Sequence, residues 1–106
     1  MAEQVQASHI LLMYKGSARS SATRTKDEAI KLIAELDAKV AAGADFAALA
    51  RAHSDCPSAA KGGDLGSFGR GQMVGAFEEA AFGLPVGGTS GVIETQFGYH
   101  LVRRTA

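Results

Sequence analysis

The segment that most constrains the fold is an apolar run near the N-terminus, VQASHILLM at residues 5–13. Its side chains alternate with the two-residue period of a β-strand, because successive side chains point to opposite faces. One face carries Ile10 and Leu12, so the strand is apolar on both sides and should be buried on both. The other face consists of Val5, Ala7, His9, Leu11 and Met13.

Composition excludes several classes of protein. The chain has 106 residues, of which 46% are hydrophobic and 21% charged, which suits one domain spanning residues 1–106. No apolar run approaches the roughly 20 residues that a bilayer requires, and no basic stretch precedes the first hydrophobic segment as in a signal peptide. The formal net charge of zero argues against nucleic acid as a partner. We therefore expect a cytoplasmic protein that binds neither nucleic acid nor membrane. We also expect a whole protein that is monomeric.

Two helices are predicted after a polar loop. The sequence TKDE at residues 25–28 is a capping box, and Gly43 supplies a stop for the helix that it opens. Asp45 can cap a second helix, so the two should form a hairpin. The expected inner residues of the first helix are Ile30, Ile33, Leu36 and Val40, and those of the second are Phe46, Leu49, Ala50 and His53.

The C-terminal half alternates short strands with one helix. LGSF at residues 65–68 reads as a strand, and residues 75–84 as a helix with Phe77 on its apolar side and a stop at Pro85. The runs GVIET (91–95) and GYHLVRR (98–104) suggest a closing hairpin. The order of elements predicts an α+β domain with an antiparallel or mixed sheet covered by helices. The apolar side of that helix also holds Ala81 and Leu84.

Two histidines lie in predicted strands, His9 near one end of the chain and His100 near the other. Pairing of the terminal strands would bring them side by side, although a single histidine in a strand is most often structural. His53, Asp55 and Cys56 lack the spacing of a metal site, so we expect no metal.

Cys56 is the one cysteine of the chain, so no internal disulfide can form. A thiol and a histidine suggest a Cys/His hydrolase, but no partner that would orient the base is evident and the chain is short for a peptidase. The alternative is that Cys56 is a small buried apolar residue. These residues alone leave both interpretations open.

Glycines are concentrated after Cys56, in HSDCPSAAKGGDLGSFGRGQM at residues 53–73, with five glycines in ten positions. Backbone without side chains allows a ligand or a tight turn to approach closely. The apolar residues nearby could line a small pocket, or they could simply belong to the core. These residues are Leu65, Phe68, Met73 and Phe77.

Four motifs, in this order, resemble the parvulin-type peptidyl-prolyl cis/trans isomerases: SHILL (8–12), the segment 53–73, AFEEAAFGL (76–84) and SGVIETQFGYHLVRR (90–104). The resemblance implies an α+β fold with a four-stranded antiparallel sheet surrounded by four helices, one of them at residues 58–61. It also implies that the two histidines lie on neighbouring central strands. The expected activity is non-covalent acceleration of rotation about X-Pro bonds, without metal or cofactor, in proline-containing peptides and proteins.

The family's functional positions fall on two groups of residues here. The resemblance implies a catalytic group and a group that binds the proline ring. The catalytic group comprises His9, Ser54, Cys56, Thr95 and His100, and the binding group comprises Leu65, Phe68, Gln72, Met73 and Phe77.

The loop after the first strand, YKGSARSSATRTK, is basic and contains no acid. One branch of the family binds phosphoserine or phosphothreonine before proline through cations in this loop, where Lys15 and Arg19 lie here. Met13 stands where that branch has a lysine, so the cluster is incomplete. The alternatives are a preference for Glu or Asp without phosphate, or simple solubilisation of the loop. A rival for the whole chain is a binding module that grips proline without accelerating its rotation.

Overall fold

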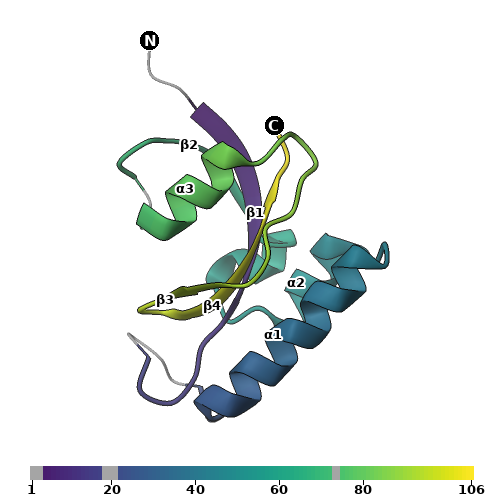
Figure 1. Cartoon of the computed structure of the whole chain (residues 1–106), viewed down its shortest axis with the longest axis vertical. Coiled ribbons are helices and arrows are strands. Elements are labelled where there is room, and N and C mark those ends of the chain that lie inside the picture. The colour runs from purple at the N-terminus through teal and green to yellow at the C-terminus, as the bar shows by residue number, and fades with distance from the viewer. Residues whose placement is uncertain (1–3, 18–21, 73–74) are drawn as a thin grey trace.

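The computed structural model describes residues 4–17, 22–72 and 75–106, so the predictions for Arg19 and Met73 lie outside the described residues. Four strands form one antiparallel sheet in the order β2-β1-β4-β3, with helices on both faces (Figure 1). The strands are β1 (Gln4–Leu12), β2 (Asp64–Gly69), β3 (Ile93–Thr95) and β4 (Gly98–Arg104). β3 is shorter than the predicted strand at 91–95, and the α+β class is confirmed.

The helices divide between the two faces of the sheet. In Figure 1, α1 and α2 lie on one side of β1 and β4, and α3 lies on the other. The described residues form three α-helices and one 3₁₀ helix, so the expected fourth helix is a short 3₁₀ helix that begins at Pro57. No helix among the described residues is long and apolar enough to span a bilayer. The bounds are α1 (Lys26–Ala41), α2 (Phe46–His53), η1 (Pro57–Lys61) and α3 (Gly75–Gly83).

The predicted helix signals act as expected. Thr25 caps α1 by accepting from the Glu28 N–H, while the Glu28 carboxylate accepts from the Thr25 N–H. Asp45 caps α2 through the Ala47 N–H. Gly43 follows the end of α1 with a φ of +99°, a conformation that glycine adopts without strain.

Two apolar clusters confirm that β1 is buried on both faces. Ile10 and Leu12 pack with α1 and α2 on one side, and Val5 and Ala7 pack with Phe77 of α3 on the other. These two layers fix the sheet between its helices and so fix which side chains can share a cavity.

The prediction that Ile30 belongs to the buried stripe of α1 is wrong, because Ile30 is 43% exposed. Ala29 faces the sheet in its place and is fully buried. Neighbouring helical residues are rotated by about 100°, so only one of this pair can point inward. The buried stripe is Ala29, Ile33, Leu36 and Val40.

Strand register brings the two histidines together. In the β1/β4 pair, His9 lies opposite Val102 and His100 lies opposite Leu11. The two histidines therefore occupy the same face as diagonal neighbours on the two central strands. The expectation of neighbouring central strands is confirmed.

A close backbone contact also fixes the position of His9. The His9 N–H donates to the Gly63 carbonyl at 2.9 Å. A Cβ at Gly63 would lie 2.3 Å from the His9 carbonyl oxygen, and the φ of Gly63 is +84°. Glycine is required here, so the GG pair after η1 is what allows this segment to lie against β1.

Candidate active site

The paired histidines form the centre of a buried hydrogen-bonded chain. His9 Nδ1 lies 3.4 Å from His100 Nδ1, and the rings stack with their planes 24° apart. His100 Nε2 lies 2.7 Å from Thr95 Oγ1, which also accepts from the Phe97 N–H at 3.2 Å. The short β3 strand and its turn therefore orient one imidazole, and that imidazole orients the other.

Proton positions in this chain follow from the hydrogen-bonding capacity of each group. A hydrogen bond between two Nδ1 atoms needs a proton on one ring and a bare nitrogen on the other. If His100 supplies the proton, the Thr95 hydroxyl donates to His100 Nε2, and if His9 supplies it, His100 Nε2–H donates to Thr95. In both arrangements, His9 Nε2 is buried without a hydrogen-bond partner among the described residues.

Both imidazoles are neutral near pH 7. Burial, together with the neighbouring His100, lowers the pKa of His9 from 6.5 to about 4. Burial also lowers the pKa of His100 to about 4. Two neutral rings can form an Nδ1–Nδ1 hydrogen bond without the repulsion that two cations would suffer. The apolar surroundings keep both rings neutral and also strengthen the hydrogen bond between them.

The histidines form one wall of a cavity of about 260 Å³ between the sheet, α3 and the segment before η1. Almost all of its wall is apolar, the Cys56 thiol lies in it, and the polar atoms of the His9–His100–Thr95 chain are largely covered. The structure thus brings six of the predicted site residues to one cavity. The lining residues are His9, Leu11, Cys56, Leu65, Phe77, Thr95, Phe97 and His100.

Phe77 holds the histidine rings from the α3 side. Its ring meets His9 edge to face at 5.4 Å and His100 at 5.9 Å between centroids. Phe68 lies behind it, 6.0 Å from the Phe77 ring, and is buried in the cluster under α3. Phe68 therefore supports the cavity wall from behind and does not line the cavity itself.

Three other predicted residues, Gln72, Ser54 and Lys15, do not line the cavity. The Gln72 side chain accepts from the Gly69 N–H at 2.5 Å and closes the loop after β2. The Ser54 hydroxyl accepts from the Leu11 and Cys56 N–H groups at 3.0 and 3.4 Å, so it holds the backbone behind the thiol. Lys15 is exposed, and its N–H donates to the Arg24 carbonyl.

Two lining residues were not predicted as site residues. Leu11 shares the His9 face of β1, so strand alternation contained the signal for it. Phe97 reads as part of a two-residue turn, and its place at the cavity depends on how the β3/β4 hairpin folds back. Nothing in the sequence pattern distinguishes a turn phenylalanine that lines a pocket from one that is merely exposed.

The neutral histidines predict a specific dependence of stability on pH. Unfolded histidine titrates near pH 6.5, whereas the folded pair titrates near 4, so the unfolded chain binds more protons in this interval. The contribution to stability is complete above pH 6.5 and is lost as the pH falls toward 4. We expect the free energy of unfolding to fall by about 1–2 kcal/mol per histidine between pH 7 and pH 5.

Urea unfolding at pH 7, 6 and 5 measures this loss, in a range where most carboxylates remain ionised. The variant His100→Leu has one buried imidazole fewer and should lose about half as much between the same pH values. Stability that stays constant from pH 7 to pH 5 in the unmodified protein would contradict the neutral pair.

Comparison with known proteins gives the same family from sequence and from structure. The family model for the PPIC-type PPIASE domain matches residues 1–106. The chain is 42% identical over 115 residues to peptidyl-prolyl cis-trans isomerase Pin1 of Arabidopsis thaliana, covering 98% of this chain and 97% of the relative.

Two solved structures are similar over nearly the whole chain. The peptidyl-prolyl isomerase ESS1 from Candida albicans superposes with a TM-score of 0.90 at 40% identity, covering 97% of this chain and 63% of that one. The solution structure of TbPIN1 gives a TM-score of 0.89 at 35% identity, covering 100% of both. The matched family, the fold and the cavity that holds the paired histidines agree, and the chain belongs to the parvulin, or PPIC-type, peptidyl-prolyl cis-trans isomerases.

Proposed function

We propose that this isomerase acts without covalent chemistry, by binding the twisted X-Pro amide more tightly than either planar isomer. The observation that carries the proposal is the single cavity that combines an apolar wall, the Cys56 thiol and two neutral imidazoles. Its substrates are then proline-containing peptides and proteins, and no cofactor is needed. The monomeric state and the cytoplasmic location stay predictions from the sequence.

The energetics of the reaction explain why such a cavity is sufficient. Rotation about the bond must break amide resonance, a barrier of about 18–20 kcal/mol, although the cis and trans forms differ by only about 0.5–1 kcal/mol. Each tenfold acceleration requires about 1.4 kcal/mol of preference for the twisted form. In that form the amide nitrogen is more amine-like and the carbonyl loses resonance, so exclusion of water and well-placed polar groups both contribute.

The cavity divides into two parts that suit the two halves of the bond. Leu65 and Phe77 supply an apolar surface for the pyrrolidine ring. Cys56 supplies a polar atom for the carbonyl on the preceding residue, and the His9–His100–Thr95 chain keeps the wall beside it rigid. A proline ring held against this rigid wall leaves the carbonyl of the preceding residue free to rotate beside the thiol.

A nucleophilic role for Cys56 fits the site poorly. A Cys/His hydrolase relies on an imidazole that accepts the thiol proton and remains stable as a cation. The pKa of each histidine here is lowered to about 4, so proton transfer from a thiol to either ring is strongly unfavourable. We therefore assign Cys56 an electrostatic role.

Replacing the thiol tests this assignment. We expect Cys56→Asp to keep most of the activity, because a carboxylate is also small and polar, and Cys56→Ala to lose about 10- to 100-fold. The rate of exchange between cis and trans forms of an Ala-Pro peptide, measured by NMR, reports rotation itself, whereas a protein that only grips proline would bind without raising this rate.

The unfolding midpoint of each variant serves as the control for folding. Activity that is lost equally in both variants, with normal unfolding midpoints, would contradict an electrostatic role. Cleavage of the peptide by the unmodified protein would support the hydrolase instead.

We further propose that this enzyme favours an acidic or phosphorylated residue before proline. Leu11 lines the cavity, and exposed Lys15 follows only four residues later along the chain, at the start of the basic loop. The hydrogen bonds with the Thr25 N–H and hydroxyl hold the pKa of the nearby Glu28 carboxyl below its usual range, and the charges of Arg24 and Lys15 add to this effect. This local acid reduces the attraction for a substrate anion, so the preference should be modest rather than absolute.

Paired peptides measure this preference. We expect pSer-Pro and Glu-Pro peptides to react about 3- to 10-fold faster than Ser-Pro peptides at low salt. The difference should shrink at about 0.5 M salt, because salt at that concentration screens charges strongly. Lys15→Gln should reduce the difference, while Lys39→Gln, the same charge change in the last turn of α1, should preserve it. Equal rates for pSer-Pro and Ser-Pro would remove the phosphate preference.

A further inference from the structure

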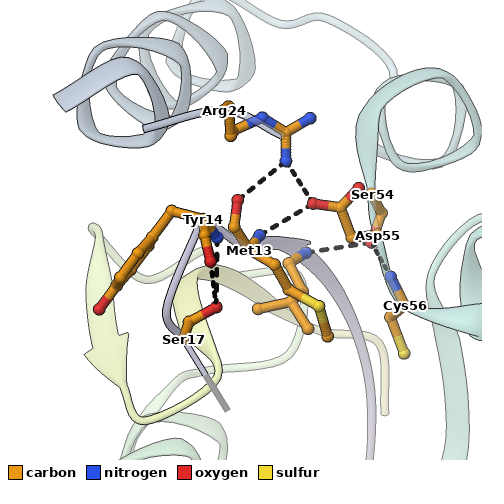
Figure 2. A network of polar contacts seen from close by, with 8 residues as sticks. Met13, Tyr14, Ser17, Arg24, Ser54, Asp55 and Cys56 are labelled. Carbon is orange, nitrogen blue, oxygen red and sulfur yellow. Dashed lines mark hydrogen bonds and ion pairs between the residues drawn. The ribbon is translucent and has the colours of Figure 1, made fainter. Parts of the chain in front are cut away.

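A polar network outside the cavity joins three segments that are far apart in the sequence (Figure 2). The Asp55 carboxylate accepts from the Met13 N–H at 2.8 Å and from the Arg24 guanidinium. The same Arg24 nitrogen donates to the Met13 carbonyl at 3.1 Å. Arg24, Asp55 and the Met13 peptide groups therefore form a closed set of contacts at the end of β1.

This network continues into the backbone that carries the thiol. The Asp55 N–H donates to the Leu11 carbonyl at 2.7 Å, and the Ser54 hydroxyl accepts from the N–H groups on both sides, those of Leu11 and Cys56. The segment 54–56 is thus held against the end of β1. Because Cys56 is the next residue after Asp55, a displacement of Asp55 must also move the thiol.

Arg24 belongs to the base of the basic loop. Its carbonyl accepts from the Lys15 N–H at 2.9 Å, which closes the loop between Lys15 and Arg24. The same residue therefore holds the loop through its backbone and the Cys56 segment through its side chain. A hollow of about 300 Å³ lies next to it, lined by Met13, Ala22, Thr23, Arg24 and Asp55.

The Arg24–Asp55 pair is more buried than the other ion pair described here. The Arg24 and Asp55 side chains are 25% and 29% exposed, compared with 54% for each member of the Lys26–Glu94 pair. Partial burial reduces screening by water and salt, and the guanidinium makes two contacts at once. Both features favour a fixed geometry over a transient surface attraction.

We propose that Arg24 and Asp55 are positioning residues, whose ion pair couples the basic loop to the segment that places Cys56 in the cavity. The inference rests on the proposed role of Cys56 in catalysis. Neither residue lines the cavity that receives the proline ring, so they act on the reaction only through the backbone of residues 54–56 and the end of β1.

A double-mutant cycle tests the coupling. Arg24→Gln removes the charge and the guanidinium nitrogen that contacts both partners, whereas Asp55→Asn keeps an acceptor for the Met13 N–H and removes the charge. Each should lower kcat/KM by about 5- to 10-fold through kcat, because displacing a group that stabilises the twisted amide costs rate more than binding. The double variant should lose no more than the worse single variant, since both changes break one interaction.

Three comparisons separate positioning from a general loss of stability. Arg24→Lys, which keeps the charge and can still donate to both partners, should recover part of the kcat. Lys39→Gln, with the same charge change on the far end of α1, should match the unmodified protein. All rates are measured at a temperature where each variant is folded, and full additivity of the two single changes would overturn the proposal.

Alkylation of Cys56 by iodoacetamide provides a readout that does not depend on catalysis. Release of the segment should make the thiol roughly threefold more reactive in Arg24→Gln, because local opening exposes it. If the unmodified protein proved inactive on X-Pro peptides, the proposed function would fail while this comparison still tested the coupling. Unchanged alkylation in both single variants would overturn the coupling even in an active enzyme.

Discussion

The pairing of β1 with β4 is the constraint on which the site depends. These strands come from opposite ends of the chain, and their register places His9 and His100 as diagonal neighbours on one face. A slip of one residue would move one imidazole to the opposite face, where α1 and α2 pack. The close contact of Gly63 with the His9 backbone and the buried layers on both faces oppose such a slip.

Burial gives the histidine pair its chemical character. A pair of exposed imidazoles would titrate near neutral pH, whereas desolvation holds the pKa of each ring at about 4. The pair is thus a rigid, neutral wall rather than a proton donor and acceptor for covalent chemistry. The charged contact lies outside the cavity, where the Arg24–Asp55 ion pair joins the basic loop to the backbone of Cys56.

Sequence patterns predicted the parts that depend on local chemistry. The capping residues Thr25 and Asp45 act as predicted, because a cap needs only its own first turn. The strand pattern suggested that pairing of the terminal strands brings the histidines together, and resemblance to the family placed them on neighbouring central strands, because no local pattern determines which strands pair. Ile30 was misassigned since helical rotation leaves two neighbouring apolar residues nearly equivalent until the sheet is in place. Phe97 and the Arg24–Asp55 pair depend on contacts between distant segments, so no spacing in the sequence indicates them.

The hydrogen bond between the two Nδ1 atoms can be tested directly by long-range ¹H–¹⁵N correlation spectra of the histidine rings at pH 7. The account predicts that one Nδ1, from either His9 or His100, is protonated, that the other Nδ1 is bare, and that neither ring is cationic. Two bare Nδ1 atoms, or a ring protonated on both nitrogens, would contradict the neutral, proton-sharing pair.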